Sequence, residues 1–238
     1  MFRRRKYDRS VMLFQGAILI RRKSKPEKRI RPAPEGGKRD QNRRERSQAL
    51  QDAALALFLD HGVEGVGVEA IAHAAGLAKG SFYNYFEDQP ALVDALLAPA
   101  RDGVRAAFAS CRDALQAAHE PAMAPLAYLA LAQALSEVVK DHARVCRLYL
   151  QEARGPAVGA RAPLVALAGE IAAAALDLSR EAQRLGLLKP VDPRVSSLAV
   201  IGATERLLHA HLEGELDKDG QEVAADLVSL VLQGILAT

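Results

Sequence analysis

Aromatic residues are scarce in this chain, which has six Phe, five Tyr and no Trp among its 238 residues. Cysteine is scarcer still: Cys111 and Cys146 are too few for a disulfide scaffold and suit a reducing compartment. Runs of β-branched residues with alternating polarity are missing, whereas helix-favouring alanine and leucine dominate the hydrophobic half of the composition. The sequence therefore predicts an all-α protein, with room for one large or two small domains.

Long apolar runs are also missing, since none approaches the roughly 18 residues that a membrane-spanning helix needs. The chain starts with MFRRRKYDR and then VMLFQGAILI, which have the basic and apolar character of a secretion signal. The basic stretch RRKSKPEKR then stands where a signal would carry its small-residue cleavage site. We therefore expect no membrane contact and a cytoplasmic location.

Charge is distributed unevenly along the chain. Residues 1–46 carry 17 Lys and Arg against 5 Asp and Glu, a net charge of +12, whereas residues 47–238 carry 15 against 24, a net −9. A basic arm on an acidic body suits contact with a polyanion, although charge runs alone are often just solvated, disordered tails. Because this stretch is also rich in Pro and Gly, we predict a basic, disordered arm over residues 1–45.

Apolar periodicity begins after the arm and predicts a series of helices. Leu50, Ala54, Leu57 and Phe58 form one apolar stripe, and Gly62 is placed as a C-terminal cap. The predicted helices start near Ser47, run from Val68 to Ala75, run from Ala78 to Phe86, and resume from Pro90. Two short helices separated by Gly76 describe a helix-turn-helix, so we assign residues 46–90 to a DNA-binding domain and residues 91–238 to a larger helical domain.

The few aromatics are concentrated in HAAGLAKGSFYNYF, residues 73–86, directly around this turn. Phe82 and Phe86 fit the core that the helices share. The other side chains suit DNA, because a lysine near a helix N-terminus attracts phosphate, and Tyr and Asn can bond to phosphates or base edges. The alternative is an ordinary surface helix. The predicted DNA-binding residues are Lys79, Gly80, Ser81, Tyr83, Asn84 and Tyr85.

Residues 46–97, RSQALQDAALALFLDHGVEGVGVEAIAHAAGLAKGSFYNYFEDQPALVDALL, resemble the DNA-binding domain of the tetracycline-repressor (TetR) family of transcriptional regulators. The specific part is IAHAAGLAKGSFYNYF, followed six residues later by Leu92. This resemblance implies a homodimer that binds double-stranded DNA at an inverted repeat and is released by a small-molecule effector. Three positions depart from the family pattern and weaken phosphate contact: Gly67 replaces a capping Thr or Ser, Ala78 a Ser, and Gln89 a Lys.

The resemblance also implies that the C-terminal part binds the effector and dimerises through its last two long helices. Apolar stripes in these helices support a packed interface, although they could serve the monomer core alone. The predicted interface residues are Leu198, Gly202, Leu208, Leu212, Leu227, Leu230 and Val231.

The effector pocket is marked only by polar or polarisable residues in apolar helices, each of which could equally be core or surface. The candidates are Cys111, Tyr128, Cys146, Arg147, Tyr149, Glu152 and His209. Glu205 and His209 are four residues apart and share a face that His211 does not. His142 and Cys146 have the spacing of half a metal site, but we expect neither a metal nor a cofactor.

Three classes of function remain open. A ligand-responsive repressor is the leading interpretation, and a sequence-tolerant DNA-binding protein that uses the basic arm is the second. A helical enzyme is the third, but the sequence contains no phosphate loop, HExxH or GxSxG motif. We therefore predict a regulator and not an enzyme.

Overall fold

The computed structural model describes residues 37–118, 123–187 and 189–235, with side chains described as far as Val231, and these residues contain helices and no strand. The all-α prediction is therefore confirmed for this part of the chain. Most of the predicted basic arm, residues 1–36, lies outside the described residues. The elements are α1 (Lys38–His61), α2 (Val68–Ala74), α3 (Lys79–Phe82), α4 (Gln89–Ala117), α5 (Ala124–Asp141), α6 (Ala143–Glu152), the 3-10 helix η2 (Gly159–Arg161), α7 (Ala162–Arg184), α8 (Pro193–Leu212) and α9 (Gly220–Ile235).

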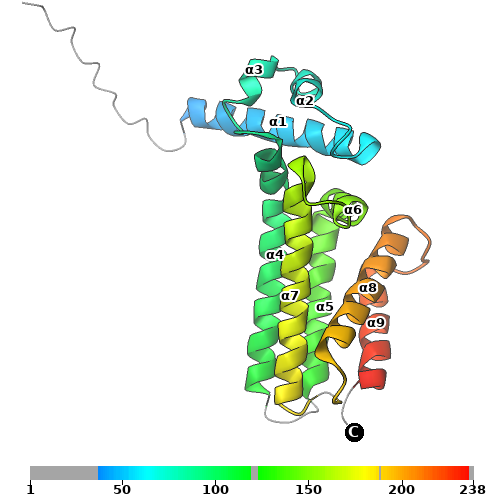
Figure 1. Ribbon diagram of the computed structural model, residues 1–238. Coiled ribbons are helices and arrows are strands. Elements are labelled where there is room, and N and C mark those ends of the chain that lie inside the picture. Colours follow the sequence, from blue (N-terminus) through cyan, green and yellow to red (C-terminus); the bar gives the residue numbers. More distant parts are fainter. Residues whose placement is uncertain (1–36, 119–122, 188, 236–238) are drawn as a thin grey trace, which may run out of the picture.

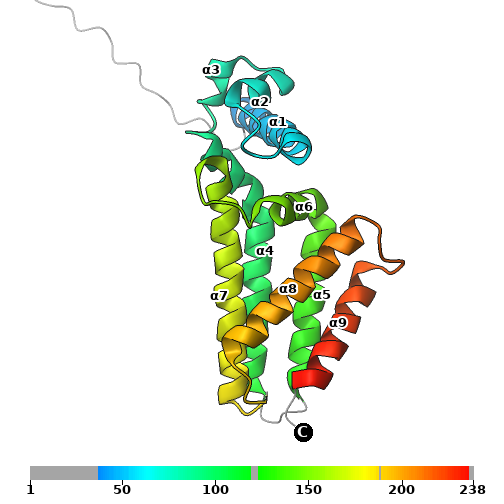
Figure 2. The ribbon, with the colours of Figure 1, turned by 45° about the vertical axis from the view of Figure 1, so that its right-hand side comes forward.

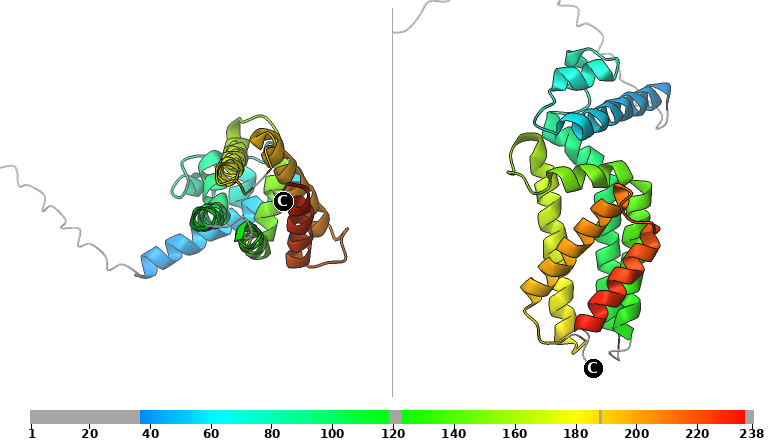
Figure 3. Two further views of the ribbon diagram at one scale, coloured as in Figure 1. Left: turned by 90° about the horizontal axis from the view of Figure 1, so that it is seen from below. Right: turned by 90° about the vertical axis from the view of Figure 1, so that its right-hand side faces the viewer.

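Helices α1, α2 and α3 form a small head on top of a taller bundle of α4, α5 and α7 (Figure 1). Helix α8 crosses the bundle obliquely, and α9 lies beside it and packs on α5 (Figure 2). Figure 3 shows the same arrangement from below and from the side. Helix α6 is short and lies between the head and the top of the bundle.

Helix α1 begins at Lys38, nine residues before the start near Ser47 that apolar periodicity predicted. The prediction was wrong because periodicity detects only the buried stripe, and α1 buries no residue before Leu50. The first turns are rich in Arg, Gln and Glu, which propagate a helix without burial. Residues 38–45, which the sequence assigned to a disordered arm, are therefore helical.

Helix α3 is shorter than predicted, since it ends at Phe82 and not at Phe86. The backbone continues in turns: the Asn84 N–H donates to the Ser81 carbonyl at 3.2 Å and the Tyr85 N–H to the Phe82 carbonyl at 2.9 Å. These three-residue steps are tighter than those of an α-helix. Tyr83, Asn84 and Tyr85 therefore project from a turn that follows the helix.

Two hydrophobic cores organise the molecule. The upper one joins the head to the bundle without a break, because Phe58 and Phe82 of the head share it with Leu148 of α6 and Leu164 of α7. The lower one lies at the far end of the bundle around Leu115. Pro99, inside α4, falls between the residues that α4 contributes to the two cores, and it removes one backbone hydrogen bond there.

The segment Gly159–Arg184, which comprises η2 and α7, is long and apolar enough to cross a membrane by length and composition. This finding corrects the expectation that no stretch of the chain reaches membrane length. In the structure the helix packs against α4 and α8 as part of the bundle.

Candidate DNA interface and effector cavity

The turn between α2 and α3 is built from backbone hydrogen bonds that only a particular sequence allows. The Leu77 N–H donates to the Ala72 carbonyl at 2.8 Å, and the Gly76 N–H donates to the His73 carbonyl at 3.0 Å. This pair of bonds is the Schellman motif, which requires a left-handed residue after the helix. Gly76 has a φ of 69° and supplies it, as the sequence predicted.

The helix-turn-helix is held by side chains that are fully withdrawn from solvent. Ile71 and Ala72 of α2 and Phe82 of α3 are completely buried. The Phe82 ring packs against Phe86, with 5.7 Å between ring centroids, and meets Tyr83 edge-on at 5.4 Å. The sequence-based assignment of Phe82 and Phe86 to the core is thereby confirmed.

The predicted DNA-binding residues lie together around α3 and the turn that follows it. Lys79, Gly80, Tyr83 and Asn84 are exposed, whereas Ser81 and Tyr85 are half-buried. Tyr83 is the most informative of them, because 55% of its surface is exposed in a domain whose other aromatic rings are at least partly buried. A large, rigid, half-polar ring on the surface is available to a partner, and phosphates and base edges are suitable ones.

Lys79 does not stand free on this surface. Its ammonium nitrogen lies 3.1 Å from the Glu69 carboxylate of α2, and both side chains are largely exposed. An exposed pair of this kind contributes little to stability, about 0–1 kcal/mol. Glu69 would repel a phosphate that approached Lys79. If the phosphate displaced Glu69, the loss of the ion pair would cost the fold little.

Gln89, which stands where the family pattern has a lysine, is used inside the protein. Its side-chain amide donates to the Val66 carbonyl at 2.8 Å and to the Val63 carbonyl at 3.4 Å. These bonds tie the start of α4 to the loop between α1 and α2. Gly67 offers α2 no side-chain cap, and the Gln89 amide is neutral and bonded within the protein, so neither residue supplies the phosphate contact of the family pattern.

The start of α1 provides cations nearby. Lys38, Arg39, Arg43, Arg44 and Arg46 are all exposed on its first turns. None of them forms an ion pair with another residue in the described part of the chain. They extend the head sideways as a cationic helix (Figure 1).

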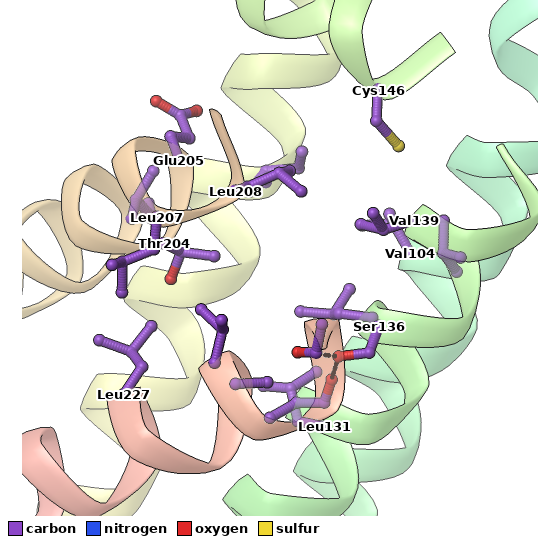
Figure 4. A pocket seen from close by; sticks show the side chains of 18 of the residues that line it. Val104, Leu131, Ser136, Val139, Cys146, Thr204, Glu205, Leu207, Leu208 and Leu227 are labelled. Carbon is purple, nitrogen blue, oxygen red and sulfur yellow. Dashed lines mark hydrogen bonds between the residues drawn. The ribbon is translucent and has the colours of Figure 1, made fainter. Parts of the chain in front are cut away.

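A second candidate site lies in the bundle. A cavity of about 740 Å³ opens between α4, α5 and α7 on one side and α8 and α9 on the other. Figure 4 looks into it: Leu131, Ser136 and Val139 of α5 line one part, and Leu208 of α8 and Leu227 of α9 line another. Its volume is within the range of sites that hold drug-sized molecules.

Three of the seven sequence-predicted pocket residues line this cavity, namely Tyr128, Cys146 and Tyr149. Burial raises the pKa of the Cys146 thiol to about 11, so the thiol stays protonated. Burial also raises the pKa of Tyr128, and that of Tyr149 is raised by burial and by the hydrogen bond to Glu205. The cavity therefore carries no thiolate or phenolate near neutral pH.

The other four predicted pocket residues do not line the cavity. Cys111 is in the lower core, where burial raises its pKa to about 11. Arg147 is exposed and pairs with Glu213 at 3.3 Å, and His209 is exposed. Glu152 lies at the junction between head and bundle. Both cysteines are free thiols, and no group of three or more His, Cys, Asp or Glu among the described residues is arranged to hold a metal.

Sequence reasoning missed two residues in the wall, Glu205 and His211. Glu205 accepts a hydrogen bond from the Tyr149 hydroxyl at 2.8 Å and pairs with Arg154. His211 lines the cavity although the sequence set it apart from the Glu205 face. Thr204, Leu208 and His211 line the cavity at steps of four and three residues, so His211 belongs to the cavity-facing stripe of α8.

The predicted dimer residues divide between two surfaces. Leu208, Leu212, Leu227 and Val231 line the cavity. Gly202 is half-buried on α8. Leu198 and Leu230 point outward, with 63% and 72% of their surfaces exposed. Of the predicted interface residues, Leu198 and Leu230 are therefore the exposed apolar ones, and Val195 on α8 is exposed as well.

The junction between head and bundle contains a buried carboxylate, Glu152, with 6% of its surface exposed. It accepts from the Val63 N–H at 3.2 Å and from the Arg161 guanidinium at 2.8 Å. The neighbouring Gln151 amide donates to the Phe58 carbonyl of α1 at 3.3 Å. Helix α6 thus binds the end of α1 through one set of side chains and lines the cavity through Cys146 and Tyr149.

The fold and the turn geometry define a helix-turn-helix protein with a separate ligand-sized cavity. Residues 50–96 match the profile described as "Bacterial regulatory proteins, tetR family". The match covers most of the head and the start of α4, which therefore resemble the DNA-binding domain of TetR-family regulators. A search of the curated proteins found no match.

Solved structures share the whole fold. The fatty acid degradation regulator FadR from Bacillus halodurans is 17% identical, with a TM-score of 0.61 over 79% of this chain and 95% of that chain. The ketosteroid transcriptional regulator KstR2 of Mycobacterium tuberculosis is 24% identical, with a TM-score of 0.60 over 81% and 96%. The TetR family transcriptional regulator PfmR from Thermus thermophilus is 21% identical, with a TM-score of 0.56 over 77% and 97%. At these identities the likeness shows the fold.

Proposed function

We propose that the protein is a cytoplasmic, ligand-responsive repressor that binds an inverted-repeat operator as a homodimer and leaves it when a small molecule occupies the cavity. The proposal rests on the position of α6, which is bonded to the DNA-binding head and also forms part of the cavity wall. A ligand that favours a different position of α6 also favours a different position of the head. Binding at one site then changes affinity at the other.

Dimerisation supplies the geometry that operator binding requires. One helix-turn-helix reads one half-site, and two heads about 34–36 Å apart, or a multiple of it, read successive major grooves on one face of the duplex. The exposed apolar side chains of Val195, Leu198 and Leu230 are the surface best suited to hold two chains in that relation. In a two-fold pairing the same patch serves both partners.

A footprint on the DNA that flanks the gene for this protein tests the proposal. We expect protection of one inverted repeat that overlaps a promoter. Protection without a preferred site would instead support the second candidate, a sequence-tolerant DNA-binding protein. The exposed, unpaired cations at the start of α1 favour that alternative.

Neutralising Arg43 and Arg44 separates the two candidates. In a repressor the Arg43→Gln, Arg44→Gln variant should still prefer the same DNA site. Its binding should depend less on salt, with the slope of log affinity against log salt smaller by about 1–2. Fluorescence anisotropy titrations at several salt concentrations give this slope. An unchanged slope would mean that the start of α1 does not contact DNA, and a loss of all binding would favour the sequence-tolerant protein.

Replacing Tyr83 by Ala should weaken operator binding by about 1–3 kcal/mol, because the exposed ring is lost from the reading surface. The fold should persist, since Tyr83 contributes no buried side chain to the core. A gel-shift titration of the folded variant measures the change. Affinity equal to that of the parent protein would remove Tyr83 from the interface.

Replacing Glu69 by Gln should strengthen DNA binding several-fold. The change removes a negative charge 3.1 Å from Lys79 and releases the lysine for phosphate. One added phosphate contact should also steepen the salt dependence, by about 1 in the log–log slope. Weaker binding in the anisotropy titration would show that Glu69 itself contacts the DNA.

A further inference from the structure

The cavity is elongated along the bundle. Its lining residues on α5 run from Tyr128 near the far end of the bundle to Lys140 near α6. At 1.5 Å per residue this corresponds to about 18 Å of helix. Most of the wall between these points is formed by Leu, Val, Ile and Ala side chains from six helices. The space therefore suits a long, mainly hydrocarbon molecule.

Charges in the wall are already balanced within the protein. Glu205 is paired with Arg154 and accepts the Tyr149 hydroxyl. Lys140 at the rim lies 3.4 Å from Glu137 and is largely exposed. Asp219 accepts from the backbone N–H groups of Gln221 and Glu222 and so caps α9. A charged ligand would be desolvated in the apolar interior, where Glu205 already has partners, and Lys140 faces solvent at the rim.

The imidazole of His211 is the one further basic group in the described wall. Its Nδ1 atom is buried and has no hydrogen-bond partner. As a neutral ring it offers a ligand one hydrogen-bonding atom. As a cation it would select an anion, which is the alternative that an experiment must exclude.

Most hydroxyl groups in the wall are turned toward the backbone. Ser136 donates to the Ala132 carbonyl at 2.9 Å, and Thr204 donates to the Val200 carbonyl at 2.8 Å. Ser196 and Ser197 are bonded to carbonyls of α8 in the same way. These groups leave the ligand few donors.

Tyr128 and Ser179 are different, since neither hydroxyl has a hydrogen-bond partner among the described residues. Tyr128 packs against the lower core, which contains Leu178, the residue next to Ser179. Both hydroxyls are therefore near the end of the cavity that is far from the head. A polar atom of a ligand would find donors there and apolar surface along the rest of its length.

We propose that the effector is an uncharged, elongated, mainly hydrocarbon molecule whose hydrogen-bonding group is held by Tyr128 at the far end of the cavity. This inference rests on the proposed function, because it names the class of molecule that the cavity takes. The hydrocarbon part lies along α5 toward Cys146 and Tyr149, where it reaches α6. The length of the hydrocarbon chain then decides whether the effector contacts α6 and, through α6, influences the head.

Three molecules with one chain length test the charge preference: decanol, decanoate and decylamine. At about pH 8 decanoate is an anion and decylamine a cation, whereas decanol is neutral. Displacement of Nile red, an uncharged dye whose fluorescence reports apolar sites, gives the affinities below the micelle concentration. Decanol should bind at least about tenfold more tightly than either ion. Tighter binding of decanoate would assign the site to anions through His211, and tighter binding of decylamine would assign it to cations; either would overturn the proposal, as would the absence of dye binding.

Two further measurements locate the ligand. From octanol to dodecanol, affinity should rise about fourfold for each added CH₂ as apolar surface is buried along the cavity. Tyr128→Phe should weaken decanol several-fold and leave Nile red unchanged, because only a hydroxyl is removed. Tyr83→Phe in the head is the matched control and should change neither. Unaltered decanol affinity in Tyr128→Phe would place the polar group elsewhere.

Operator release, measured separately by anisotropy of labelled operator, distinguishes failure of this inference from failure of the proposed function. If decanol binds in the predicted order but never releases the operator, the ligand class stands and the regulatory proposal fails. If only a charged compound binds and releases the operator, the regulatory proposal stands and the ligand class fails.

Discussion

A Leu198→Glu chain should be monomeric and should bind its operator about 10²–10⁴-fold more weakly than the parent protein. Leu198 is 63% exposed on the outer face of α8, so a glutamate there costs the monomer little. In a two-fold interface the introduced charge appears twice and is desolvated on both chains. Loss of the dimer leaves two independent heads, each of which reads a single half-site.

Sedimentation velocity measures the assembly, and a gel shift measures the binding. Leu230→Glu, 72% exposed on α9, should give the same result if α8 and α9 form one interface. Leu126→Glu is the control, because Leu126 is similarly exposed, at 59%, but belongs to α5 and not to either helix of the predicted interface. A folded Leu198→Glu chain that remains fully dimeric would remove this face from the interface.

A Glu152→Ala chain should lose about 3–5 kcal/mol of its free energy of unfolding. The change leaves the Arg161 guanidinium, which is only 17% exposed, without its buried partner. It also leaves the Val63 N–H without an acceptor. These costs fall at the contact between head and bundle, where the upper core is continuous.

Urea unfolding measures this loss, and Glu170→Ala supplies the comparison. Glu170 also pairs with an arginine, Arg105, at 2.7 Å, but both side chains are about half exposed. Its removal should cost about 0–1 kcal/mol. Equal losses of unfolding free energy in the two variants would show that Glu152 does not stabilise the contact between head and bundle. The milder Glu152→Gln should remain folded and, with the head less firmly oriented, bind the operator more weakly.

The helix-turn-helix could be predicted from the sequence because its determinants are local. Ile71, Ala72 and Phe82 lie within one short segment, and Gly76 marks the turn between two apolar stripes. Their spacing alone places them in a shared core, as the structure confirms. Tyr83 could then be predicted as an exposed DNA-binding residue, because it is a large aromatic side chain outside that core.

The inner and outer faces of α8 and α9 could not be assigned in the same way. Both faces carry leucine, so the sequence grouped Leu208 and Leu227 with Leu198 and Leu230 in one interface. The structure turns the first two toward the cavity and the last two outward. The difference depends on the angle at which α8 crosses the bundle, which no local pattern specifies.

Glu152 shows a second reason for the limits of sequence reasoning. Its acceptor role depends on Val63, 89 residues earlier in the chain. A glutamate in an apolar helix indicates either a ligand contact or an internal ion pair, and only the folded contacts distinguish them. The same holds for Gln89, whose carbonyl partners lie in the preceding loop.

Selection of bound duplexes from a random DNA library tests the central claim, that α2 and α3 present a sequence-reading surface in a symmetric dimer. The full chain should enrich an inverted repeat whose half-sites are centred about one helical turn, or a multiple of it, apart. The Tyr83→Ala variant should enrich it far less. Enrichment of no sequence, or of a single unrepeated site that the variant enriches equally well, would contradict the account.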